Sequence, residues 1–271
     1  MFPEIDELKK IASSYNFVPV AKRLSLTKDE EERLLLSLAR DKETVYFSGG
    51  NHALGNYSYF VIQPTRSITV LDGVLIDSSK QGDKVVKGVN PHNYLERILK
   101  EHEQPVISGL PPFTGGLIGY FSYEYTKYYQ RHINFQHTNP DNIQDIGLFG
   151  SDKLIAYNRD KSEVSLIISI ATENLEANYK QAKEKLEELK IRVFARIGKT
   201  YEMPQLKMTG DFQMHFNEAE YSNKVQIAKE HITVGDIFQL IMSNPQKVNL
   251  TGDLLPLLRQ LMIDEPHAYH F

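Results

Sequence analysis

The chain has 271 residues, enough for one large domain or two small ones with a sizeable core. Its 31 basic and 35 acidic side chains give a net charge of only -4 and form no basic stripe, which argues against nucleic acid or an anionic membrane as a partner. The absence of cysteine excludes disulfides and thiolate chemistry and, with an acidic amino terminus and no long apolar run, favours a cytoplasmic location.

Short helices are predicted from capping signals in the first hundred residues. Pro3 suits the first turn of a helix that continues to Tyr15. Thr27 and Glu30 have the spacing of a capping box at the start of a second helix, and Asn90-Pro91 opens a third.

Antiparallel strands are predicted between and after these helices. The β-rich runs before the third helix are residues 45–48, 57–62, 67–71 and 74–76, and Asp72-Gly73 is a hairpin signal between the last two. The polar stretch 77–90 is predicted as a surface loop. Further along, residues 153–157 and 164–170 are predicted to form another hairpin.

Residues 110–125, LPPFTGGLIGYFSYEY, have the most unusual composition of the chain. Three glycines lie inside an apolar, aromatic run that otherwise resembles a strand. Glycine weakens a strand unless a bulge or another group must approach closely, so the run is interpreted either as a core strand crossed by a neighbour or as a strand facing a ligand.

The second half begins with the longest predicted helix, which has one apolar stripe and a solvated Lys/Glu face and ends near residue 197. Residues 198–214 contain two glycines and a proline and are the best candidate for a boundary between subdomains. Asn217 and Glu220 then form a capping box for an amphipathic helix that ends at Gly235. The apolar run 237–242 that follows is predicted to be a buried strand.

Motifs that carry catalytic chemistry are absent from the sequence. It has no phosphate-binding loop, dinucleotide fingerprint, nucleophile elbow or zinc-protease motif. His132 and His137 lack a second ligand at metal-binding spacing, so both are interpreted as surface histidines.

Four stretches follow one another along the chain: GNYSYFVIQP (residues 55–64), LPPFTGGLIGYFSYEY (110–125), AKEHITVGDIFQLIMS (228–243) and PHAYHF (266–271). In this order they resemble one known family, that of anthranilate synthase component I and its relative aminodeoxychorismate synthase component I. The resemblance implies an α+β fold, a two-lobed antiparallel β-sandwich with peripheral helices. Residues 1–200 would form the amino-terminal region, and residues 211–271 the incomplete start of a chorismate-binding domain.

The resemblance also implies the activity of the complete enzyme. Such enzymes convert chorismate and ammonia, supplied by a glutamine amidotransferase subunit, into anthranilate and pyruvate for tryptophan biosynthesis. Mg²⁺ acts there as a Lewis acid. The family's Mg²⁺ ligands and catalytic residues lie beyond Phe271, so no catalytic or metal-binding residue is expected here. The chain alone is predicted to be inactive and to bind no cofactor.

A feedback site for L-tryptophan is the part of the family's machinery that falls within this chain. By resemblance its residues are Ser48, Ala268, Tyr269 and His270. The family's Leu-Glu before the serine is replaced by Tyr46-Phe47, and a proline and a methionine are replaced by Ala268 and His270. Loss of the carboxylate removes the expected partner of the ligand's ammonium group.

Two alternatives to an anthranilate synthase component I remain from the sequence. One is an aminodeoxychorismate synthase component I of folate biosynthesis, and the other is a non-catalytic truncated or regulatory fragment that binds an amino acid. Because the predicted strand at 237–242 would lack neighbours, we also expect exposed apolar surface and a tendency to aggregate.

Overall fold

The structure, a computed structural model, describes residues 1–41, 44–49, 57–130, 132, 139, 142–199, 202–265 and 269–270. The chain divides into two compact units. Unit 1 consists of Met1–Tyr201 with Leu261–Phe271, and unit 2 consists of Glu202–Gln260. Within the described part of the chain, no helix is long and apolar enough to cross a membrane.

The larger sheet of unit 1 has six antiparallel strands in the order β1-β10-β9-β3-β2-β15. Strands β9 and β10 form the hairpin predicted from the sequence, whereas β15 comes from the far end of the chain and completes the edge beside β2. The six strands are β1 (Phe17–Ser25), β2 (Thr44–Gly49), β3 (Tyr57–Ile62), β9 (Lys153–Asn158), β10 (Glu163–Ala171) and β15 (Tyr269–His270).

Strand β1 was not predicted. Its sequence, FVPVAKRLS, contains Pro19, which cannot donate a hydrogen bond to a sheet. The sheet tolerates this proline because β1 is an edge strand. It pairs along its length with β10, and on its outer side Ala21 exchanges backbone hydrogen bonds with Phe2.

The second sheet of unit 1 has five antiparallel strands in the order β6-β5-β4-β8-β7. The predicted hairpin is confirmed: Asp72 and Gly73 join β4 to β5, and their φ angles of 47° and 77° are those that a tight hairpin turn requires. The five strands are β4 (Arg66–Leu71), β5 (Val74–Ser79), β6 (Gly82–Val86), β7 (Gly116–Phe121) and β8 (Ile146–Ser151).

Strand β6 lies inside the stretch 77–90, which was predicted to be a surface loop. That prediction is wrong over residues 82–86, where β6 pairs with β5. Four of its five residues are exposed, so there is no apolar alternation from which a strand could be recognised.

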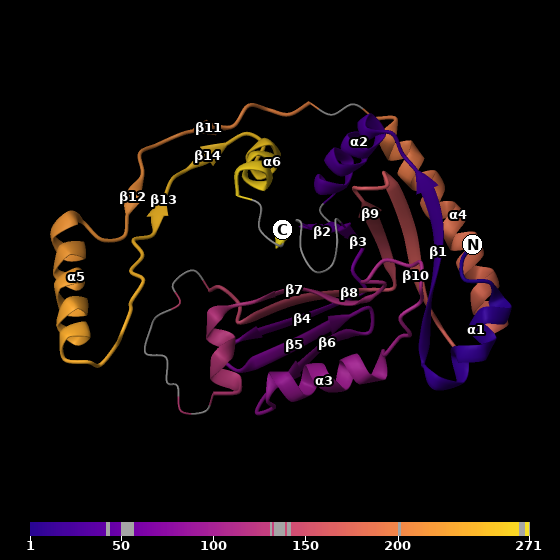
Figure 1. Ribbon diagram of the computed structural model, residues 1–271, viewed down its shortest axis with the longest axis horizontal. Helices are drawn as coiled ribbons and strands as arrows, with labels where there is room; N and C mark the ends of the chain where they lie inside the picture. The colour runs from indigo at the N-terminus through magenta and orange to yellow at the C-terminus, as the bar shows by residue number, and fades with distance from the viewer. Residues whose placement is uncertain are drawn as a thin grey trace. The chain divides into compact units, whose positions relative to one another are not determined.

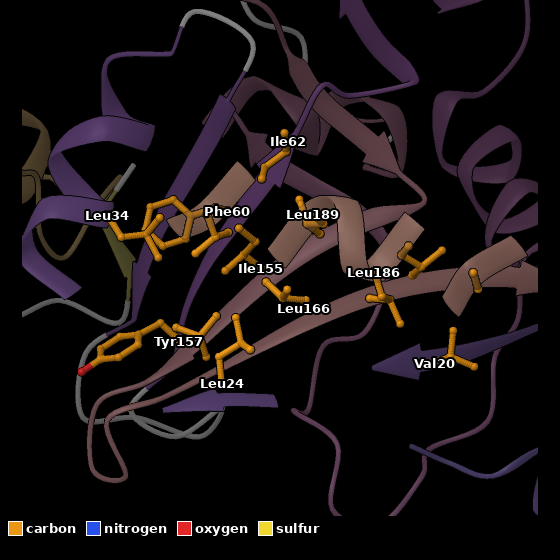
Figure 2. Close-up of a cluster of buried hydrophobic side chains, with 14 of the residues drawn as sticks. Val20, Leu24, Leu34, Phe60, Ile62, Ile155, Tyr157, Leu166, Leu186 and Leu189 are labelled. Carbon is orange, nitrogen blue, oxygen red and sulfur yellow. The ribbon is translucent and has the colours of Figure 1, made fainter. Parts of the chain in front are cut away.

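Helices cover the outer faces of both sheets (Figure 1). Helices α1 (Ile5–Ile11), α2 (Lys28–Ala39) and α4 (Leu175–Ile197) pack with the six-stranded sheet around the largest buried cluster, part of which Figure 2 shows. On the other sheet, α3 (Pro91–Glu101) packs its Tyr94, Leu95 and Ile98 against β4, β5 and β8. The predicted capping box of α2 is confirmed, with Glu30 N donating to Thr27 Oγ1 at 3.3 Å and Thr27 N donating to Glu30 Oε2 at 2.8 Å.

A third buried cluster joins the two sheets. Phe47, Tyr59 and Ile167 of the six-stranded sheet belong to it, and Phe113 and Ile118 pack against them from the segment that leads into and forms β7. Unit 1 is therefore a β-sandwich with helices on both outer faces, as the sequence predicted.

Unit 2 is built differently. Helix α5 (Glu218–Thr233) begins at the predicted capping box, in which Glu220 N donates to Asn217 Oδ1 at 3.0 Å, and Gly235 follows it with a φ of 84°. Two short pairings, β11 (Lys207–Met208) with β14 (Leu250–Thr251) and β12 (Gln213–Met214) with β13 (Gln246–Lys247), form a narrow ribbon that leads to α5 (Figure 1). The chain returns to unit 1 within α6 (Leu255–Asp264).

The predicted buried strand at residues 237–242 is wrong. The segment belongs to no strand, and Phe238 is 98% exposed. Its amphipathic neighbour α5 likewise has no buried residue. A buried strand needs paired neighbours on its edges and side chains above its faces, and the described residues of unit 2 supply neither for this segment.

Candidate functional site

The candidate ligand site predicted by resemblance lies at the edge of the six-stranded sheet. There β15 pairs with β2, so that His270 is the partner of Ser48 and Tyr269 the partner of Gly49. The structure thus brings together residues from opposite ends of the chain. Ala268, the fourth predicted residue, lies outside the described residues.

Ser48 is buried and its hydroxyl is engaged. The guanidinium of Arg159 donates Nη2 to Ser48 Oγ and also to Ser58 Oγ at 3.1 Å. Ser58 lies opposite Ser48 on β3, and both serines are almost fully buried. A guanidinium held between two hydroxyls can bind a carboxylate, with the hydroxyl protons as additional donors.

Arg159 is the functional candidate that the sequence did not reveal. It lies just after β9, in the polar turn that joins β9 to β10. In the sequence this segment has the composition of an ordinary solvent-exposed turn. Its position beside Ser48 results from the β2-β3-β9 register, in which Ser48 opposes Ser58 and Tyr57 opposes Asn158.

The two residues that replace the family's Leu-Glu pair have become core residues. Tyr46 stacks on Phe60 with 4.6 Å between ring centroids. Phe47 lies on the opposite face of β2, buried in the cluster between the sheets. Because both positions are committed to packing, neither offers a carboxylate to the ammonium group of an amino acid.

The glycine-rich run 110–125 has a packing explanation. Its third glycine, Gly119, faces β8 so closely that a Cβ atom there would lie 2.0 Å from the carbonyl oxygen of Gly147. The interpretation as a strand crossed by a close neighbour is therefore confirmed for this position.

Two residues just after this run help to anchor a buried carboxylate. Tyr128 donates its hydroxyl to Asp145 Oδ2 at 2.6 Å, and Lys127 Nζ lies 2.9 Å from the same oxygen. Burial, followed by this hydrogen bond, raises the pKa of the Tyr128 phenol. The phenol therefore stays protonated and acts as a structural donor.

A second buried carboxylate, Asp77, is satisfied in the same way. Arg66 Nε donates to Asp77 Oδ1 at 2.8 Å, and Tyr94 donates its hydroxyl to Asp77 Oδ2 at 2.7 Å. Burial alone would raise the pKa of Asp77, but the hydrogen bonds from Arg66 and Tyr94 outweigh it and hold the pKa below the ordinary value of 3.8. These partners make Asp77 a structural anion.

Side chains that could hold a metal do not gather anywhere in the described residues: no group of three or more His, Asp or Glu is found there. His132 lies in a turn and is exposed, and His137 is outside the described residues. The side chains that the structure describes therefore do not fit a Mg²⁺ centre, and we assign no step to that ion.

Comparison with known proteins connects this fold to named relatives. Residues 45–271 match the family model of chorismate binding enzymes. Anthranilate synthase component 1 of Neisseria gonorrhoeae (strain ATCC 700825 / FA 1090) is 28% identical over 270 residues, covering 96% of this chain and 54% of that protein. The protein of the same name from Aquifex aeolicus (strain VF5) is 24% identical over 284 residues, covering 98% of this chain and 55% of the relative.

A solved structure supports the same fold. The crystal structure of anthranilate synthase component I from Streptococcus pneumoniae TIGR4 matches with a TM-score of 0.61 at 22% sequence identity, over 92% of this chain and 54% of that chain. The chain spans about half the length of the relatives it matches. Because the family model covers most of its residues, the chain belongs to the chorismate-binding enzyme family.

Proposed function

We propose that this chain is the amino-terminal part of an anthranilate synthase component I, the subunit that converts chorismate and ammonia into anthranilate and pyruvate in tryptophan biosynthesis. The observation that carries the proposal is the collinear match to proteins of that name over nearly the whole chain, which stops about halfway along each of them. A glutamine amidotransferase subunit is the proposed source of ammonia in the cytoplasm.

We infer different roles for the two units of the proposed enzyme from the difference in how their apolar side chains are buried. Unit 1 folds around its own core, whereas many large apolar side chains of unit 2 are exposed. We assign unit 2 to the chorismate-binding half, whose remaining residues would cover α5 and residues 237–242. Residues 1–271 alone should therefore make no product.

The test uses a chimaera in which residues 1–271 replace the aligned part of the Neisseria gonorrhoeae relative. Given chorismate, Mg²⁺ and ammonium, the chimaera should produce anthranilate, detected by its fluorescence, while residues 1–271 alone should produce none. Aminodeoxychorismate as the product would favour the folate enzyme instead. A folded chimaera that makes neither compound would contradict both assignments, and anthranilate from the isolated chain would contradict the roles inferred for the two units.

We further propose that the β2–β15 edge is where L-tryptophan binds as a feedback inhibitor, through Ser48, Ala268, Tyr269 and His270. Support comes from the pairing of Ser48 with His270 and from the guanidinium of Arg159 beside them, which suits the ligand's carboxylate. Titration calorimetry on the chimaera should show tryptophan binding that Ser48→Ala weakens. The absence of any tryptophan binding would remove this part of the proposal.

A further inference from the structure

A cavity of about 350 Å³ in unit 1 lies away from the β2–β15 edge. It is bordered by the start of β1, the carboxyl-terminal turn of α3, the start of β7 and the turn that joins β8 to β9, and no residue of β2 or β15 lines it. Its volume falls in the range of small-ligand sites.

Three of the side chains that line this cavity each carry a buried polar atom with no hydrogen-bond partner among the described residues. These atoms are Gln104 Oε1, Asp152 Oδ1 and Ser169 Oγ. Leaving buried polar atoms unpaired is costly, so three of them around one cavity indicate that a donor belongs there.

The three side chains are held close together by the backbone. Ser169 N donates to Asp152 O at 2.9 Å, which places these two residues side by side. Gln104 and Ser169 both pack against Gly115, where a Cβ atom would lie 2.9 Å from Gln104 Nε2 and 3.2 Å from Ser169 Oγ. Gly115, in the signature run 110–125, therefore leaves the space in which these polar groups converge.

The polar side chains of Gln104, Asp152 and Ser169 together suit a protonated amine. One carboxylate oxygen, one amide oxygen and one hydroxyl can accept its three N–H bonds, and the carboxylate offsets its charge.

The other walls match the rest of a small zwitterion. Phe17 and His102 stack with 5.1 Å between ring centroids, and Ile98 and Leu117 add apolar surface. Of the cations that line the cavity, Arg66 is already bound to Asp77, whereas Lys80 has no salt bridge within the described residues and can bind a carboxylate.

We propose that this cavity binds a free α-amino acid with an apolar side chain, its ammonium group on Asp152, Gln104 and Ser169 and its carboxylate on the side of Lys80. This site is separate from the tryptophan site proposed at the β2–β15 edge and does not depend on it.

The test is titration calorimetry of the full chain with each of the twenty standard L-amino acids. At least one apolar amino acid should bind. Asp152→Asn should weaken that binding at least about tenfold, because a charged hydrogen bond is lost. Lys80→Gln, on the exposed rim, should weaken it by a smaller factor. Asp211→Asn, an exposed aspartate of unit 2, is the matched control and should leave the affinity unchanged.

A ligand variant makes the test independent of protein folding. If phenylalanine binds, 3-phenylpropionate, which lacks the amine, should not; for any other amino acid that binds, the corresponding deaminated acid serves. The proposal is overturned if no amino acid binds up to about 10 mM, if the deaminated acid binds equally well, or if Ser48→Ala rather than Asp152→Asn abolishes binding. Loss in Ser48→Ala alone would assign the ligand to the β2–β15 edge.

Discussion

The two units of this chain use similar side chains to opposite effect. Phe60 in β3 is 3% exposed and packs beneath α2 and α4, whereas Phe238 after α5 is 98% exposed. Both lie in apolar runs that predict burial. The difference shows that an apolar run identifies side chains that are stabilised by burial, while the surfaces that bury them must come from other segments. In unit 1 the strands and helices provide these surfaces, and in unit 2 the described residues do not.

The largest expected difference in stability is between alanine substitutions at these two phenylalanines. Phe60→Ala removes a ring from a filled core and should lower the free energy of unfolding by about 3–5 kcal/mol. Phe238→Ala, the matched control, should change it by less than about 0.5 kcal/mol because its ring contacts water. Urea denaturation followed by circular dichroism measures both. Equal effects would show that residues 237–242 are buried in the isolated chain.

Ion pairs offer the same comparison. Asp77→Ala leaves the Arg66 guanidinium inside unit 1 without the carboxylate of its ion pair. This should lower the free energy of unfolding by about 3 kcal/mol. In unit 2, Asp236 contacts His231 at 2.7 Å, but both side chains are more than half exposed. Asp236→Ala should therefore cost less than about 1 kcal/mol in the same denaturation experiment. A larger loss for Asp236→Ala than for Asp77→Ala would contradict this ranking.

Two glycine substitutions compare how closely the backbone is packed in the two units. Gly119→Ala would place a Cβ atom against the carbonyl of Gly147, and the forced displacement of β7 from β8 should cost about 2 kcal/mol. Gly210 in unit 2 has nothing within 4 Å of its hypothetical Cβ, so Gly210→Ala should be neutral or slightly stabilising. Melting temperatures of the two variants provide the comparison, and a stable Gly119→Ala variant would mean that the strands pack less closely.

The smallest effect is a pH dependence confined to unit 1. The pKa of Asp77 is lowered in the folded state, so its contribution is complete above the unfolded value of about 4 and is lost as the pH falls through the folded value. The difference in unfolding free energy between the wild type and Asp77→Asn should thus be constant near neutral pH and shrink in acid. A difference that widens in acid would show that the pKa is raised instead.

Local signals in the sequence predicted local structure well. The capping boxes at Thr27 and Asn217 and the Asp72-Gly73 hairpin depend on residues three or fewer positions apart, and all three are present. Gly119 indicated a close neighbour, although the sequence could not identify Gly147 as that neighbour.

Features that depend on distant segments could not be predicted in the same way. Strand β6 has no apolar alternation, and the exposure of residues 237–242 depends on what covers them. The contact of Arg159 with Ser48 requires the register of three strands, two of which are far from Arg159 in sequence. For the proposed ligand sites, resemblance supplied positions at the β2–β15 edge, while the cavity beside Asp152 emerged only from the packing of unit 1.

Hydrogen exchange tests the central claim most directly, that unit 1 is stabilised by its own core while unit 2 depends on cover from another segment. In residues 1–271 alone, the amides of β9 and β10 should exchange slowly, and those of α5 and residues 237–242 should exchange orders of magnitude faster. In the chimaera with the carboxyl-terminal half of the relative, α5 should become as protected as β10. Equal protection of α5 and β10 in the isolated chain would contradict the account.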